Sequence, residues 1–165
     1  MIVSYRQWYG HVDVRINNRV YGSGRYDVPG RELSSFGLRG TNVLRVTDAS
    51  RHRQSLEACG CEATGYTLNV SPEQEAQISR YFENQIANAS PVAARPNNYI
   101  LPDDYSFVTN NCATNAADAL QSGLPWYLDP LLSGVLEPKA LEIRLKTIAR
   151  PLVNDRTQYS TPTRP

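Results

Sequence analysis

The sequence predicts a single α+β domain in which a small antiparallel sheet packs on a helix that carries a cysteine. Three observations predict it: an alternating hairpin pattern near the start of the chain, a strongly capped helix in its middle, and an alanine-rich helix after that. The chain has 165 residues, of which 41% are hydrophobic and 20% charged. These values are typical of one globular domain, since two half-length domains would each bury little surface.

The N-terminal part of the chain shows the period-two alternation of a half-buried sheet. Valine and isoleucine alternate with polar residues over positions 9–16, which predicts a strand with His11 and Asp13 on its polar face. Asn17-Asn18 is a turn pair, because asparagine tolerates positive φ. We therefore expect a hairpin at this point. The other predicted strands cover residues 19–23, 42–47 and 65–70.

The clearest helix signal begins at Ser71. Ser71 suits the N-cap, Pro72 suits the first helical position, and Gln74 completes a capping box, which together predict a helix through residue 89. An alanine-rich helix is predicted over residues 111–122, where small side chains allow close packing on a sheet. One or two further helices are expected within residues 130–148.

We expect one folded domain over residues 1–149 and a loose, polar, proline-containing tail over residues 150–165. The 17 basic and 16 acidic residues leave a net charge of +1, which argues against a nucleic-acid-binding protein, because phosphate binding needs a basic excess. The sequence has no apolar run of the roughly 20 residues that a membrane span requires. Its first residues also lack the pattern of a secretory signal peptide.

The chain has three cysteines, Cys59, Cys61 and Cys112, and an odd number argues against a disulfide framework. Cys59 and Cys61 are separated by one residue, whereas zinc-binding pairs are usually separated by two to four. Only His52 lies near them in the sequence, so a metal site is a weak alternative. We interpret the pair as two small thiols beside a turn, and we expect no metal or cofactor.

Cys112 differs from the other two because it stands at the first turn of the alanine-rich helix. Free N–H groups and the helix dipole favour a thiolate there, and the same amides can hold an oxyanion. A nucleophilic cysteine also needs an imidazole to take its proton. His11 lies on a rigid strand and is favoured, whereas His52 lies between Arg51 and Arg53 in a run that suggests a solvated loop. The alternative interpretation is a small core cysteine and a structural histidine.

These segments resemble the permuted NlpC-like cysteine peptidases, which are members of the papain-like fold. The resemblance is carried by the Gly-His strand at 10–16, the segment 18–27 after it, and the Asn-Asn-Cys segment at 110–114, in this order. It implies a circularly permuted papain-like (NlpC-type) fold, with Cys112 as nucleophile and His11 as base.

The resemblance also implies a polar third residue that orients the imidazole. Hairpin geometry favours Ser23 for this position, and Asp13 is the alternative because it shares the face of the histidine. Asn110, Asn111 and Tyr105 flank the nucleophile and are candidates for substrate binding. Their alternative roles are helix capping for the asparagines and core packing for the tyrosine.

Bacterial enzymes of this kind commonly cleave amide bonds of peptidoglycan stem peptides, and many compact ones are toxins delivered into competitors. The resemblance thus implies an antibacterial effector, secreted without a signal peptide by a machine such as type VI secretion, that acts in the periplasm of a target bacterium. The resemblance also implies an immunity protein and a carrier of the secretion machine as partners. The alternatives are a related enzyme that acts on lipid or protein acyl groups, or a papain-fold binding module without turnover.

Overall fold

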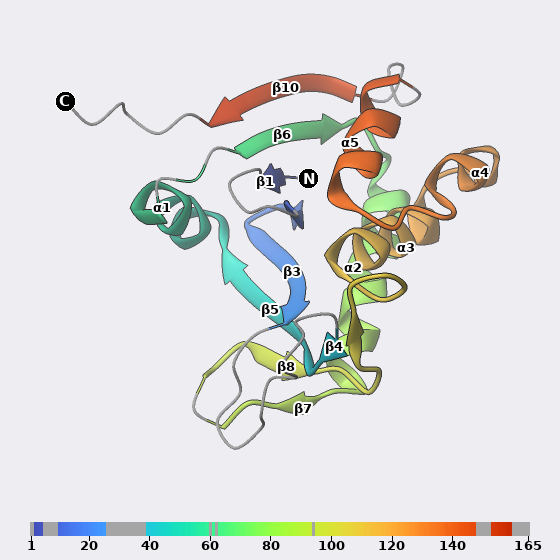
Figure 1. Cartoon of the computed structure of the whole chain (residues 1–165). Coiled ribbons are helices and arrows are strands. Elements are labelled where there is room, and N and C mark those ends of the chain that lie inside the picture. The colour runs from blue at the N-terminus through green and yellow to red at the C-terminus, as the bar shows by residue number, and fades with distance from the viewer. Residues whose placement is uncertain are drawn as a thin grey trace.

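The computed structural model describes residues 2–4, 10–25, 39–59, 61, 63–93, 95–147 and 153–159, and shows a mixed α+β fold (Figure 1). Its main sheet is antiparallel, with the strand order β10-β6-β1-β2-β3-β5-β8-β7, and β4 and β9 form a separate pair. The strands are β1 (Ile2–Ser4), β2 (His11–Ile16), β3 (Arg19–Arg25), β4 (Arg39–Gly40), β5 (Asn42–Asp48), β6 (Ala63–Leu68), β7 (Ser90–Pro91), β8 (Asn98–Ile100), β9 (Tyr105–Ser106) and β10 (Val153–Tyr159).

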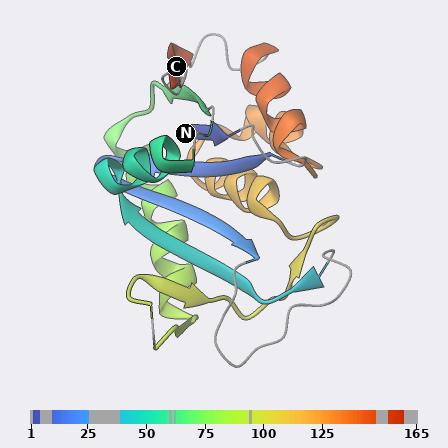
Figure 2. The same ribbon diagram turned by 60° about the vertical axis from the view of Figure 1, so that its left-hand side comes forward.

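Helices cover both faces of the central strands. Figure 2 shows α1 on one face of the sheet and α2 and α3 on the other. The contacts agree, since α1 packs against β3 and β5, whereas α3 packs against β2, β3 and α2. The helices are α1 (Ala49–Cys59), α2 (Pro72–Ala87), α3 (Cys112–Gly123), α4 (Asp129–Leu132) and α5 (Pro138–Thr147), with a 3-10 turn at Trp126–Leu128.

The predicted hairpin is confirmed. Strands β2 and β3 pair with Val14 opposite Tyr21 and Ile16 opposite Arg19, and Asn17 takes the positive φ of 51° that the turn requires. Tyr9, the first residue of the predicted strand, lies outside the described residues. The hairpin matters for the site because it fixes which side chains of β2 point to α1 and which to α3.

The hydrophobic core lies between the sheet and α2 and α3. The core side of β2 consists of Val12, Val14 and Ile16, and these residues belong to one buried cluster with the alanines of α3. Tyr21 stacks on Phe82 of α2 with ring centroids 4.4 Å apart. The alanines of α3 let it approach the sheet closely, as the sequence predicts.

The predicted helices form with the expected caps. Ser71 accepts a hydrogen bond from the backbone N–H of Gln74, and the Gln74 side chain accepts one from the N–H of Ser71, which completes the capping box of α2. Asn111 caps α3 in the same way with Thr114. The region expected to hold one or two helices contains α4 and α5.

The prediction of a loose tail is wrong for residues 153–159. They form β10, which pairs with β6 from Val153 opposite Leu68 to Tyr159 opposite Ala63. Strand β10 is added at the edge of β6 through backbone hydrogen bonds, which do not depend on the side chains of the added strand. Its sequence therefore does not need to alternate between apolar and polar residues, and the sequence pattern does not reveal the strand. Residues 150–152 and 160–165 of the predicted tail lie outside the described part of the chain. Among the described helices, none has the length and apolar character needed to cross a membrane.

Candidate functional site

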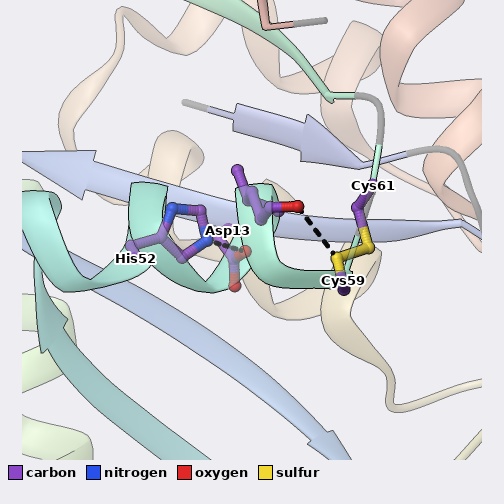
Figure 3. The surroundings of a disulfide bond; sticks show 5 residues. Asp13, His52, Cys59 and Cys61 are labelled. Atoms are coloured by element: carbon purple, nitrogen blue, oxygen red, sulfur yellow. Dashed lines mark hydrogen bonds and ion pairs between the residues drawn. A yellow bond between two sulfur atoms is a disulfide. The ribbon is translucent and has the colours of Figure 1, made fainter. Parts of the chain in front are cut away.

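A buried carboxylate between two imidazoles forms the strongest polar cluster on the α1 face of the sheet. Oδ1 of Asp13 lies 2.9 Å from Nε2 of His11, and Oδ2 lies 2.9 Å from Nε2 of His52. The side chain of Asp13 is 9% exposed, that of His52 is 12% exposed and that of His11 is 28% exposed. Solvent therefore reaches the cluster most easily at His11. Figure 3 shows Asp13 facing His52, with a dashed line for the contact between them.

Three elements position this cluster. His11 and Asp13 are alternate residues of β2 and share the face that Val12 and Val14 do not use. His52 projects from α1 onto the same face. Gly22 of β3 makes room for the carboxylate, because a Cβ at Gly22 would collide with Oδ1 of Asp13 and lie 3.4 Å from Nε2 of His11. A residue with any side chain at position 22 would push the cluster apart.

The two histidines keep Asp13 ionised. Burial alone raises the pKa of a carboxyl group, but the charge and hydrogen bonds of His11, with those of His52, hold the pKa of Asp13 well below its usual value. An ionised carboxylate can only accept hydrogen bonds, so both imidazoles donate from Nε2.

This arrangement suits general acid–base catalysis. A buried carboxylate fixes the tautomer and the pose of an imidazole and stabilises its protonated form. Two imidazoles anchored to one carboxylate allow one ring to take a proton while the other gives one. The cluster is also compatible with a purely structural role, in which it ties α1 to β2.

Cys112 lies on the other side of β2. Helix α3 packs on the core side formed by Val12 and Val14, whereas His11 points toward α1. Among the described residues no hydrogen bond joins the sulfur of Cys112 to either imidazole. Cys112 is buried, is not disulfide-bonded, and occupies the first helical position after Asn111. No hydrogen bond or ion pair of the described residues joins the predicted nucleophile to the predicted base, so their pairing stays a prediction.

The two candidates for the third catalytic residue are separated in the same way. Asp13 hydrogen-bonds to His11. Ser23 is the neighbour of Gly22 on β3 and faces the α3 side with Tyr21. Its buried hydroxyl has no hydrogen-bond partner among the residues that the structure describes. Strand alternation places Ser23 and His11 on opposite faces, so Ser23 does not orient the imidazole in this structure.

The predicted substrate-binding residues have other roles in the structure. Asn111 is buried and uses its whole amide: Oδ1 accepts from the N–H groups of Ala113 and Thr114, and Nδ2 donates to the carbonyls of Phe107 and Leu136. This is a capping role.

Asn110 and Tyr105 lie in the segment before α3. Asn110 lines a cavity of about 360 Å³ together with Asn42, Asn115 and Asp118, while its Nδ2 donates to the carbonyl of Asp104. Burial raises the pKa of Asp118 there. Tyr105 lies in β9, opposite Gly40 of β4. Of the residues predicted to bind substrate, Asn110 alone lines this cavity.

The expectation that His52 lies in a solvated loop is wrong. Residues 49–59 form α1, and the imidazole of His52 is turned inward while its neighbours Arg51 and Arg53 are exposed. The sequence does not reveal this because the contact with Asp13 spans 39 positions and α1 has no apolar stripe. The one sequence signal for this contact is Asp13, a charged residue between two apolar residues of a strand, which indicates a buried carboxylate that needs a partner.

The expectation of two separate thiols at Cys59 and Cys61 is also wrong. The two residues form a disulfide with Cα atoms 5.2 Å apart, at the end of α1 (Figure 3). The sulfur of Cys59 also lies 3.1 Å from the carbonyl oxygen of Leu56. An odd number of cysteines argues against a framework of several disulfides, but it does not exclude a single disulfide between two cysteines that are neighbours in the sequence. Within the described part of the chain no group of three or more His, Cys, Asp or Glu side chains is arranged to hold a metal ion.

Comparisons with protein-family models, with curated proteins and with solved structures found no match to this chain.

Proposed function

We propose that this protein is a hydrolase that cleaves amide bonds of peptidoglycan stem peptides, with acid–base catalysis by His11, Asp13 and His52. One observation carries the proposal: a buried, ionised carboxylate anchors two imidazoles, one of them accessible to solvent. Structural ion pairs seldom need two histidines on one buried aspartate, whereas proton transfer to and from a substrate does benefit from them. The substrate class rests on the resemblance to permuted NlpC-like peptidases.

The nucleophile has two possible identities, and each gives a balanced reaction. In the cysteine form, the sulfur of Cys112 attacks the carbonyl carbon, the C–N bond breaks, and an imidazolium gives its proton to the leaving amine. Water then cleaves the thioester. In the direct form, a neutral imidazole takes a proton from water as the oxygen attacks the carbonyl carbon. The C–N bond breaks, and the other ring, which starts as an imidazolium, gives its proton to the leaving amine. Exchange of one proton between the rings through solvent then restores the starting state.

Different observations support each form. The cysteine form is supported by Cys112 at the capped start of α3 and by the chain order, with the histidine strand before the cysteine helix, as in a circularly permuted papain-like fold. It requires His11 and Cys112 to come to the same side of β2. The direct form is supported by the present positions of the two imidazoles.

As an antibacterial effector, the protein would act in the periplasm of a target bacterium and be neutralised by an immunity protein in the producing cell. These parts of the proposal rest on the resemblance alone. Expression directed to the periplasm of a susceptible bacterium tests them, because a periplasmic toxin stops growth there and not in the cytoplasm.

The reaction is tested with purified peptidoglycan and mass spectrometry of the released fragments. We expect new amine and carboxylate ends in stem peptides, and a loss of about 10³-fold for His11→Ala. Cys112→Ala then separates the two forms, because it abolishes turnover in the cysteine form and spares it in the direct form. Arg53→Ala, one position after His52 and exposed, is the matched control. Intact peptidoglycan after incubation with folded wild-type protein would contradict the proposed substrate.

A further inference from the structure

The cavity that Asn110 lines has a buried floor and an exposed rim. Its volume is about 360 Å³, at the lower end of the roughly 300–1,000 Å³ that is usual for small-ligand sites. On the floor, Asn42 is 2% exposed, Asn115 is 5% exposed and Leu101 is 7% exposed. The rim carries exposed polar residues, which include Asn84, Asp103 and Asp118. This size and depth suit one small molecule or one long side chain.

The amide of Asn42 on the floor of the cavity lacks a hydrogen-bond partner. Its Oδ1 is buried and accepts no hydrogen bond from the residues that the structure describes. A buried oxygen without a donor destabilises the protein, so an unpaired one beside a cavity points to a molecule that supplies the donor. The last torsion of an asparagine side chain turns easily, so Oδ1 of Asn42 can face a molecule in the cavity.

Three other amides of the cavity use their N–H groups within the protein. Nδ2 of Asn115 donates to Oε1 of Gln85 at 3.3 Å, and Nε2 of Gln85 donates to the hydroxyl oxygen of Tyr81 at 3.2 Å. Nδ2 of Asn110 donates to the carbonyl oxygen of Asp104 at 2.8 Å. No hydrogen bond from the described residues reaches Oδ1 of Asn110 or of Asn115. The cavity therefore offers its occupant more acceptors than donors.

The charge of the cavity favours a cation. Among the described residues that line it, Asp103 and Asp118 carry carboxyl groups, and none is a lysine, an arginine or a histidine. Burial raises the pKa of Asp118, and no cationic group of the described residues counters this effect. Burial and then the charge of Asp118 raise the pKa of Tyr81, so the carboxyl group and the phenol are neighbours. A positively charged donor would pair with Asp118 and match the surplus of acceptors, whereas an anion would be repelled.

We propose that this cavity binds a primary alkylammonium group, either the side chain of a lysine in a peptide or a free linear amine. An ammonium group has three N–H donors and a positive charge, so it can donate to Oδ1 of Asn42 and of Asn115 while it faces Asp118. Methylene groups of its chain can contact Leu101. An organic cation fits better than a metal ion, because no group of three or more metal-ligating side chains gathers among the described residues. The proposal does not depend on the proposed hydrolase activity, since the cavity shares no residue with the cluster around Asp13.

The test is isothermal titration calorimetry of the full chain with Nα-acetyl-lysine amide, n-pentylamine and Nα-acetyl-norleucine amide. We expect the two amines to bind saturably and the norleucine amide to bind about tenfold more weakly, because it lacks the charge and the donors. Both amines support the site, and the tighter one identifies the source as a lysine side chain or a free amine. No saturable binding of either amine, or equal binding of the norleucine amide, would overturn the proposal. Tighter binding of N-acetylglucosamine than of either amine would assign the cavity to a neutral sugar and overturn it equally.

Two variants locate the binding site. Asp118→Asn keeps the shape of an exposed side chain and removes its charge, so it should fold and weaken amine binding about fivefold. Glu83→Gln, an exposed residue of α2 outside the cavity, is the matched control and should leave the affinity unchanged. Asn42→Leu should weaken binding about tenfold without lowering the midpoint of thermal unfolding, because Oδ1 of Asn42 has no partner to lose. Unchanged amine affinity in both Asp118→Asn and Asn42→Leu would place the binding elsewhere and overturn the proposed site.

Discussion

The two faces of strand β2 are built on opposite principles. On the α3 side, Val12, Val14 and Ile16 join an apolar cluster that many combinations of similar side chains could form. On the α1 side, Asp13 is buried with two specific partners, each at 2.9 Å, and a glycine that leaves it room. A buried charge is costly unless it is paired, so the α1 face gains little from packing and depends on individual residues. This contrast assigns the core to α3 and the candidate chemistry to α1.

The largest effect is expected from Asp13→Ala. Both imidazoles lose their anchor, so we expect turnover of peptidoglycan to fall about 10³-fold and the free energy of unfolding to fall by about 3 kcal/mol. Denaturant unfolding and fragment release measure the two quantities. Asn115→Ala removes a buried polar side chain of α3 and should lower stability less, with turnover retained. Wild-type turnover in a folded Asp13→Ala protein would remove the catalytic role of the cluster.

The next largest effect is expected from acid, which should reduce the contribution of the α1 face of β2 to stability and not that of the apolar α3 face. The pKa of Asp13 is lower in the folded chain than its ordinary value of 3.8, so its contribution to stability is present above this pH and is lost as the pH falls further. We expect the free energy of unfolding to decline from about pH 4 downward, and Asp13→Asn to decline less steeply. Thermal unfolding at several pH values measures both slopes. Parallel slopes would show that Asp13 is not the group that titrates.

Two glycines allow a matched comparison of the faces. A Cβ at Gly22 collides with Asp13, whereas a Cβ at Gly123 lies 2.5 Å from the carbonyl oxygen of Gln74, between α2 and α3. Gly22→Ala and Gly123→Ala should each lower stability by about 2 kcal/mol, because both overpack a close contact. Gly22→Ala alone should also reduce turnover. Equal turnover in the two variants would mean that the position of Asp13 does not matter for activity.

The smallest effect is expected from the disulfide. Cys59 and Cys61 close a loop with one residue between them, so reduction should release little chain entropy. We expect the double variant Cys59→Ser and Cys61→Ser to lose about 1 kcal/mol of unfolding free energy and to keep its turnover. Thiol titration before and after reduction confirms the starting state. A loss of turnover would link the end of α1 to the cluster.

The sequence predicts the α3 face far better than the α1 face, and the reason is physical. Apolar alternation in β2 and the capping residues Ser71 and Asn111 are local signals, and each local signal corresponds to an element that forms. Helix α1 buries no apolar side chain fully, and β10 is held through backbone pairing with β6, so neither has a local apolar signature.

In the candidate site, too, local patterns could be predicted from the sequence and tertiary contacts could not. His11 and Asp13 could be placed together from strand alternation alone, because they are two residues apart on one face. The role of His52 depends on how α1 returns to the sheet, which is a tertiary contact. The pairing of Cys112 with His11 stays a prediction for a similar reason, since sequence order does not specify which face of β2 the helix covers, and α3 covers the face of Val12 and Val14.

Imidazole nitrogen NMR tests the central claim most directly, because the chain has two histidines and their ring signals are easily distinguished with His11→Ala and His52→Ala. At a pH where both rings are neutral, the account predicts that each is protonated at Nε2 and donates to Asp13. Asp13→Asn, whose side chain has one acceptor oxygen, should then change the ring signals of both histidines together. A spectrum in which Asp13→Asn changes His11 alone, while His52 shows the mixed tautomers of an exposed imidazole, would contradict the shared carboxylate and the acid–base site built on it.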